Sequence, residues 1–293
     1  MAVTFLDIQV DLQAQGPQDC GRFILEVLGP YRRGQLRVRW SDQPRPSCEP
    51  VERFIESAWR RRLEQAAAEN IHLWDGRLCR LIEYGAGAEA LDMVLGPTSF
   101  RDFVGTNLHN AHLRYSHGCD VMANPVGVSA MVSAEGRYLV LGRRSESVAY
   151  HAGRIHPIGG CLEPSTDGQA PDPFDCIIEE IGQELGIAAE LLQPITCLGM
   201  VRDKHIHQPE LMFDATVTCT VEAIRRLLPT ASGRDEHADL VVLRDHPAAV
   251  VDFIERHLAE LTPVALAGLL LHGLWRWGSG WFASTRGYVR GVV

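Results

Sequence analysis

The sequence predicts a mixed α/β fold in which helices cover a sheet. Strand-like and helical segments follow one another in mixed order along the chain. Hydrophobic residues make up 46% of the 293 residues and charged residues 22%, which is typical of a soluble globular protein with a substantial core. The length favours two domains. We place the boundary near residue 120, where the chain turns polar and irregular. This gives an N-terminal α+β domain over 1–120 and a second domain over 121–293.

Alternating polarity and β-branched content predict several strands in the first domain, and a run of strong helix formers predicts one long helix. The helix is expected over Val51–Asn70, after a proline-rich loop, and a short helical segment is expected from Thr98. The predicted strands are Thr4–Val10, Arg22–Leu28, Leu36–Trp40, Leu78–Tyr84 and Glu89–Leu95.

The second domain is expected to contain four strands and four helices. The strands are predicted at Val126–Val132, Tyr138–Arg143, Cys197–Val201 and Leu211–Thr220. The helices are predicted at Pro173–Leu185, Val221–Leu228, His246–Leu258 and Pro263–Trp277. The last of these is strongly apolar but too short to span a membrane, so we expect it to be buried.

Charge and cysteine content narrow the possible partners. The net charge of −9 disfavours nucleic acid, because an acidic chain gains nothing from counterion release. The eight cysteines form no Cys-x-x-Cys pair, which argues against a zinc knuckle or a redox dithiol. No signal peptide or membrane span is visible, so we expect a cytoplasmic protein that binds a small molecule. The sequence does not indicate the oligomeric state.

The segment from Gly159 to Ile187 carries the strongest functional signal. Its helix is framed by Asp172 as N-cap, Pro173 at the first position and Gly186 after the end. At roughly 100° per residue, the apolar side chains fall on one narrow arc. These are Phe174, Ile177, Ile178, Ile181 and Leu185. The arc predicts the buried face of the helix.

Two glutamates lie at the edge of this face. Glu180 and Glu184 are four residues apart and are therefore neighbours on the helix, whereas Glu179 points to solvent. Two adjacent carboxylates repel each other, and a hard divalent cation such as Mg²⁺ turns that repulsion into chelation. On its own, such a pair of glutamates is far more often an ordinary solvated helix edge than a metal site. The preceding Gly159-Gly160 favours a phosphate site, because glycine lets the backbone approach a phosphate closely.

These residues resemble a degenerate Nudix box, G-x5-E-x7-R-E-U-x-E-E-x-G-U with U apolar. Gly160 matches the opening glycine, and 180–187 match the end. The match departs from the pattern in four ways: about five inserted residues, no first glutamate, Glu179 in place of the arginine, and Gln183 in place of a glutamate. The resemblance implies an α/β/α sandwich with a mixed sheet and a metal held by Glu180 and Glu184.

Four blocks in order extend the resemblance over most of the chain. They are TSFRDFVGTN from Thr98, NPVGVSA from Asn124, LGRRSESVA from Leu141 and the GGCLEP segment. Together they are similar to the divergent Nudix branch of UDP-glucose and UDP-galactose pyrophosphatases, which carries an extra N-terminal domain. This similarity implies hydrolysis of a UDP-sugar to UMP and sugar 1-phosphate with Mg²⁺, or alternatively Mn²⁺.

Further site residues are expected around this segment. Arginine pairs well with pyrophosphate, and a loop carboxylate can take a proton from water. The arginine candidates are Arg143, Arg144 and Arg202, and the loop carboxylates are Glu163 and Glu236. Arg101 and Asn107, in the TSFRDFVGTN block, are expected to reach the substrate across the domain interface. The backbone of Gly159 and Gly160 is expected to contact the phosphates of the substrate.

Three alternatives remain open. The same chemistry would serve ADP-ribose, a dinucleotide or a coenzyme A derivative. The departures at Glu179, Gln183 and the insertion are also compatible with a nucleotide-binding module that has lost catalysis. An accidental match in an unrelated α/β protein is disfavoured by the four ordered blocks. His205 and His207 have spacing that could hold a metal, but we expect a polar turn there.

Overall fold

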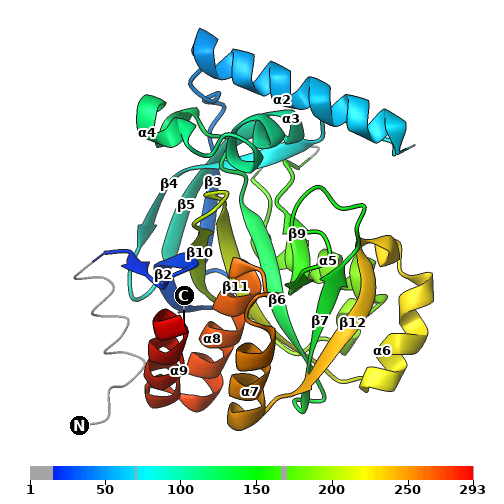
Figure 1. Cartoon of the computed structure of the whole chain (residues 1–293). Coiled ribbons are helices and arrows are strands. Elements are labelled where there is room, and N and C mark those ends of the chain that lie inside the picture. Colours follow the sequence, from blue (N-terminus) through cyan, green and yellow to red (C-terminus); the bar gives the residue numbers. More distant parts are fainter. Residues whose placement is uncertain (1–15, 70, 166–169, 293) are drawn as a thin grey trace.

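A computed structural model of the protein describes residues 16–69, 71–165 and 170–292. The strand predicted over Thr4–Val10 lies outside these ranges. The described chain forms a nine-stranded sheet, a three-stranded sheet and helices that cover both (Figure 1).

The larger sheet consists of β1 (Gln18–Asp19), β2 (Phe23–Tyr31), β6 (Gly127–Ala134), β7 (Tyr138–Arg144), β8 (Ile155–His156), β9 (Ile158–Cys161), β10 (Thr196–Asp203), β11 (Pro209–Val217) and β12 (His237–Arg244). The smaller sheet consists of β3 (Leu36–Trp40), β4 (Arg77–Ala86) and β5 (Leu91–Ser99). The α-helices are α2 (Glu49–Ala68), α3 (Phe100–Phe103), α4 (Leu113–His117), α5 (Pro173–Leu185), α6 (Val221–Leu227), α7 (Pro247–His257), α8 (Pro263–Trp277) and α9 (Ser279–Val292).

The larger sheet is mixed. Its order is β1-β2-β10-β11-β6-β7-β12, with β8 added to β7 and β9 added to β6. Most neighbouring strands run antiparallel, but β11 and β6 run parallel, with Glu210 opposite Gly127. β2 pairs with β10 although it precedes the boundary that we predict near residue 120. Sheet membership therefore does not follow the predicted division, which remains a prediction.

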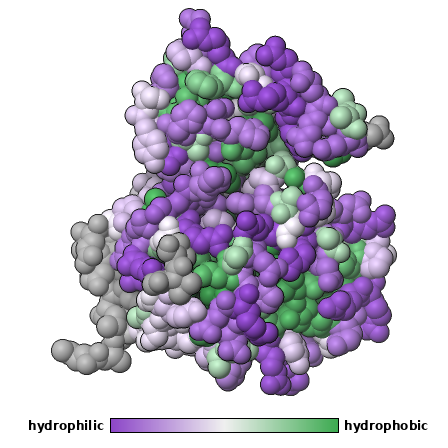
Figure 2. Space-filling model, viewed as in Figure 1, coloured by the Kyte–Doolittle hydropathy of each residue, from purple (hydrophilic) through white to green (hydrophobic). Residues whose placement is uncertain are grey.

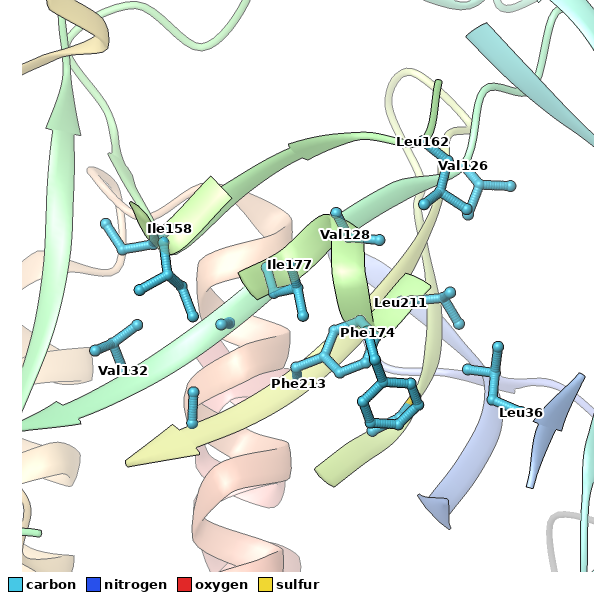
Figure 3. Close-up of a cluster of buried hydrophobic side chains, with 14 of the residues drawn as sticks. Leu36, Val126, Val128, Val132, Ile158, Leu162, Phe174, Ile177, Leu211 and Phe213 are labelled. Carbon is cyan, nitrogen blue, oxygen red and sulfur yellow. The ribbon is translucent and has the colours of Figure 1, made fainter. Parts of the chain in front are cut away.

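Helices cover both faces of this sheet, which makes the architecture an α/β/α sandwich, as expected. Alternate residues of β6 face opposite sides, as the pleat requires. Val128 lies in the core beneath α5, together with Ile177 and Phe213 (Figure 3). Met131 lies in the second core, beneath α7, α8 and α9. Figure 1 shows α5 and α6 on the far side of the sheet from α7 and α8.

The smaller sheet and α2, α3 and α4 form a cap over one end of the larger sheet (Figure 1). A third, small core joins α2 to α4 through Val51, Ile55 and Leu113. Gly105 lies so close to Ile55 that an added Cβ would be 2.5 Å from its Cα, which makes glycine necessary there. Figure 2 shows mostly hydrophilic residues on this face, with hydrophobic residues where the cap meets the body.

A buried polar cluster fixes α8 to the sheet. His272 of α8 is fully buried between Asp214 of β11 and Asp245, at 2.7 Å and 2.9 Å. Arg276 lies 2.9 Å from the other oxygen of Asp214, and Ser133 donates to Asp245 at 2.9 Å. Burial opposes the charged imidazole, but the two carboxylates outweigh it, so the pKa of His272 is raised. Every charge in this cluster has an opposite charge beside it.

Most predicted elements are confirmed, with the bounds of β3, α5 and α8 as predicted. Ile158–Cys161, which includes the two glycines of the GGCLEP segment, forms β9 against β6 and was not predicted as a strand. β12 and α9 were not predicted. In the part of the chain that the structure describes, no helix is long and apolar enough to cross a membrane.

Candidate active site

The helix α5 is held in place at both ends. The Oδ1 atom of Asp172 accepts a hydrogen bond from the backbone of Phe174 at 2.8 Å, which confirms the predicted N-cap. Gly186 has φ of 70° and ends the helix in the left-handed conformation, also as predicted. Arg33 forms ion pairs with Asp172 and Asp175 at 2.6 and 2.7 Å. These contacts therefore fix the position of the helix that carries Glu180 and Glu184.

Glu184 is the most deeply buried carboxylate of the site, with only 1% of the residue exposed. Its Oε2 atom lies 2.7 Å from Nε2 of His237, at the start of β12. Its Oε1 atom accepts a longer hydrogen bond, of 3.4 Å, from the backbone N–H of Gly159. A buried carboxylate without such partners would be costly, so these contacts hold Glu184 in one position.

Glu180 lies one helical turn earlier, with its carboxylate against Gly160. A Cβ added at Gly160 would meet the Oε1 atom of Glu180 at 2.1 Å, so only glycine leaves room for this carboxylate. Burial and then the charges of Glu184, Glu236, Glu179 and Glu163, in that order, raise the pKa of Glu180 to about 8. The surroundings of Glu180 therefore disfavour its charged form, and a bound cation would favour it.

Two further carboxylates act on Glu180 from flanking segments. Glu236 lies on the short 3-10 turn η5 (Arg234–Glu236) and is an exposed residue. Desolvation of its carboxyl group and then the charge of Glu184 raise the pKa of Glu236, while Arg144 opposes this. Glu163 is exposed and follows β9. Of the two, Glu236 acts more strongly on Glu180.

The arginines predicted for the site are separated by the structure. Arg144 is 7% exposed, donates to the backbone oxygen of Tyr150 at 3.2 Å and stacks over its ring at 4.9 Å. Its charge acts on Glu236. Arg143 points the other way, to Glu260 at 2.8 Å and to the backbone of Gly153 at 2.9 Å. Only Arg144 of this pair is brought near the acidic cluster.

The remaining predicted contacts are committed to other partners. Both ends of the Arg202 guanidinium donate to the carboxylate of Glu26. Arg101 donates to Glu56 of α2 at 2.9 Å. Asn107 is fully buried, and its amide group bonds to Asn124 and to the backbone of Ile206. Arg101 pairs within the cap and Arg202 within the larger sheet, whereas Asn107 joins the cap to the body through Ile206. Their predicted contact with substrate remains untested.

Two residues near the acidic cluster, His237 and Glu210, were not predicted from the sequence. His237 was passed over although it follows Glu236, and its Nδ1 atom is buried with no hydrogen-bond partner in the described chain. Glu210 of β11 is 5% exposed and accepts from Ser129 at 2.6 Å. Burial raises the pKa of Glu210 to about 8. A charged residue inside the apolar strand PELMFDATV was the available signal for Glu210.

The donor set can be tested for a divalent cation. Among residues 16–69, 71–165 and 170–292, no group of three or more His, Cys, Asp or Glu side chains is arranged to hold a metal ion. Mg²⁺ commonly takes one or two carboxylates and fills its octahedron with waters and substrate phosphates. Glu180 and Glu184 meet that smaller requirement, and their excess negative charge is what a cation would relieve.

Comparisons with known proteins agree with the residue pattern. The chain is 27% identical over 216 residues to the uridine diphosphate glucose pyrophosphatase NUDT22 of Homo sapiens, covering 66% of this chain and 71% of the relative. It is 26% identical over 265 residues to NUDT22 of Bos taurus, covering 82% and 90%. Nudix hydrolase 9 of Arabidopsis thaliana is 25% identical over 224 residues, covering 65% and 71%. The chain resembles the Nudix hydrolases.

No protein-family model matches the chain. A solved NUDIX hydrolase from Nitrosomonas europaea is 15% identical, with a TM-score of 0.38 over 52% of this chain and 90% of that one.

Proposed function

We propose that the protein hydrolyses the pyrophosphate of a nucleoside-diphosphate sugar, with UDP-glucose or UDP-galactose giving UMP and sugar 1-phosphate. The observation that carries the proposal is the arrangement of two acids on α5: Glu184 accepts from the backbone of Gly159, and Glu180, whose pKa is raised, lies against Gly160. The similarity to proteins named uridine diphosphate glucose pyrophosphatase supports this substrate class.

Each residue has a role in this proposal. Glu180 and Glu184 would hold Mg²⁺ or Mn²⁺, and a bound ion would neutralise pyrophosphate charge and lower the pKa of water. His237 keeps Glu184 oriented through the 2.7 Å contact. Arg144 stabilises the charge that builds on the phosphate oxygens. The backbone of Gly159 and Gly160, which lies beside Glu184 and Glu180, would contact the phosphate groups.

The reaction is a substitution at phosphorus. The oxygen of water forms a new bond to one phosphorus, the bond from that phosphorus to the bridging oxygen breaks, and the second phosphate leaves with the electron pair. A carboxylate takes the proton of the water. We assign this role to Glu236 ahead of Glu163, because Glu236 acts more strongly on Glu180 and because burial and the charge of Glu184 raise its own pKa.

The alternative of a binding module without catalysis finds less support. Two of the departures from the box, Glu179 and Gln183, bond to each other at 3.0 Å on the exposed side of α5. They lie away from the buried carboxylate of Glu184, so these two changes leave the acidic pair intact.

The test is a turnover screen of the purified protein with Mg²⁺. UDP-glucose and UDP-galactose are compared with ADP-ribose, a dinucleotide and coenzyme A, and the products are identified. We expect UMP and sugar 1-phosphate, with ADP-ribose at least about tenfold poorer in kcat/KM, because a site that bonds one base leaves polar groups unpaired with another. Preference for another nucleotide would overturn the substrate, and absence of turnover on the whole panel would favour the binding module.

A further inference from the structure

A polar pocket lies away from the acidic cluster, where the smaller sheet meets the β10–β11 turn. Its volume is about 480 Å³. Arg80 of β4, Arg202 of β10, His207 and Asn124 line it, with Glu83 and Asp120 among the other lining residues. Glu180, Glu184 and Arg144 do not line it. This pocket is therefore distinct from the site described above.

Arg80 is the unusual feature of the pocket. Only 3% of the residue is exposed, and it forms no ion pair with the described residues. Its Nη2 atom donates to the backbone oxygens of Gln43 and Pro44 at 3.2 and 3.3 Å, but its Nε atom is buried without a hydrogen-bond partner in the described chain. A buried guanidinium with an unmet donor and no paired acid is costly.

The charged side chains around Arg80 either form ion pairs with other residues or are exposed. Glu26 is committed to Arg202, and Arg45 is committed to Glu52 and Asp102. Asp120 and Glu83 are exposed residues, and neither forms an ion pair with Arg80. The positive charge of Arg80 is thus left without a buried counterion.

A second unmet group lines the same pocket. The Nδ1 atom of His207 is buried without a partner in the described chain. His207 also has a left-handed backbone, with φ of 59°, which a residue other than glycine adopts only when its surroundings hold it there. Burial and then the charges of Arg202 and Arg114 lower the pKa of His207 to about 4, so the ring is neutral and either nitrogen can carry the proton.

We infer that this pocket binds a small oxyanion, a carboxylate or phosphate group, through Arg80 and His207. The charged oxygens of an oxyanion accept hydrogen bonds, so one of them can meet the free Nε–H of Arg80 with a charge-assisted hydrogen bond. The Nδ1 tautomer of His207 supplies a second donor. The exposed carboxylates of Glu83 and Asp120 favour a singly charged group over a multiply charged one. The inference does not depend on the proposed hydrolase activity.

The experiment observes the Nε–H resonance of Arg80 in the full-length, 15N-labelled protein during titration with acetate or with inorganic phosphate, without divalent cations. The Arg80→Gln variant assigns the resonance by its loss. We expect a saturable shift with a dissociation constant of about 1 mM or tighter for at least one anion. Comparison of acetate with phosphate shows whether the pocket prefers a carboxylate or a phosphate group.

The matched control is Arg77→Gln, because Arg77 lies on the same strand but is exposed. Calorimetry should show anion binding at least about tenfold weaker in Arg80→Gln and His207→Gln than in the wild type, and unchanged in Arg77→Gln. No shift of the Arg80 resonance with either anion up to about 50 mM would overturn the inference. Undiminished binding to Arg80→Gln would overturn it as well.

Alkylation of Cys119 in the wild-type protein tests the inference even if the Arg80→Gln variant does not fold. Cys119 lines the pocket and is the one cysteine classed as exposed. Bound anion should slow its alkylation by iodoacetamide, followed by peptide mass, and should leave the alkylation of Cys48 unchanged. Equal rates at Cys119 with and without the anion would contradict the inference.

Discussion

The larger sheet carries a buried acid–histidine cluster on each face, and the two clusters differ in how their charge is balanced. Beneath α8, His272 lies between Asp214 and Asp245, and Arg276 and Ser133 satisfy the remaining oxygens. Beneath α5, Glu184 meets His237, whose second nitrogen has no partner in the described chain. Beside it, Glu180 faces four acids and has a raised pKa.

We propose that this difference separates a structural cluster from a functional one. The charges of the cluster at His272 balance, because each acidic side chain lies beside a basic one. The cluster at Glu184 brings several carboxyl groups together, and together with burial they raise the pKa of Glu180. Strongly perturbed pKa values gather at functional sites for this reason.

The largest effect is expected from His272→Ala. Removing one partner leaves two buried carboxylates facing each other, which costs about 3–5 kcal/mol of unfolding free energy. Urea denaturation measures the loss, and kcat/KM of the folded variant should stay unchanged. The control is His257→Ala, which removes a half-buried histidine that pairs with Glu260. A variant of unaltered stability but low activity would reverse the assignment of the two clusters.

Next come Glu180→Gln and Glu184→Gln. Each should lower metal-dependent turnover about 10² or more, equivalent to roughly 2.7 kcal/mol in the barrier, because these ligands act in the transition state. Glu179→Gln, on the exposed side of the same helix, should be nearly silent. Equal losses at all three positions would mean that the helix face does not define the site.

A smaller effect is expected from His237→Ala. Without the 2.7 Å contact, Glu184 loses its orientation, and residues that orient a ligand typically contribute at least about tenfold to metal affinity. The concentration of Mg²⁺ at half-maximal rate should therefore rise about tenfold, with a smaller change in kcat at saturating Mg²⁺. His237→Gln, which keeps a donor, should recover part of the loss. If kcat alone falls, His237 acts on the reaction and not on Glu184.

The smallest expected effect is a slope with pH. Because the folded pKa of His272 is raised, its stabilisation is fully present below the ordinary value of 6.5 and is lost as the pH rises through the folded pKa. The stability advantage of the wild type over His272→Gln should therefore be larger at pH 6 than at pH 9. Denaturation curves at both values provide the test, and an advantage that grows with pH would contradict it.

Local signals explain which elements could be predicted. α5 has Asp172, Pro173 and Gly186 at its ends, so both of its bounds follow from capping chemistry. β12 was missed because its exposed residues interrupt the apolar pattern, as expected at the edge of a sheet. α9 contains three glycines, which lower helix propensity, and its position follows from packing against α8.

Local signals also decide which site residues could be predicted. Glu180 and Glu184 could be identified because their relationship is local to one helix. His237 meets Glu184 across 53 residues, and Arg202 meets Glu26 across 176, so neither partner follows from local sequence. Glu210 joins the region only because β11 lies parallel to β6. Residues whose role depends on strand pairing were the ones that the sequence could not place.

The pairing of β2 with β10 has a consequence for folding. Tyr31 lies opposite Cys197, so this edge of the sheet closes only after most of the chain has been synthesised. At 5–20 residues per second, the early strand waits roughly 10–30 s for its partner. Contacts so distant in sequence slow folding, because the intervening loop must first be closed at a cost in entropy. A fragment that starts near residue 120 would also leave the β10 edge open, and an open edge invites association with other chains.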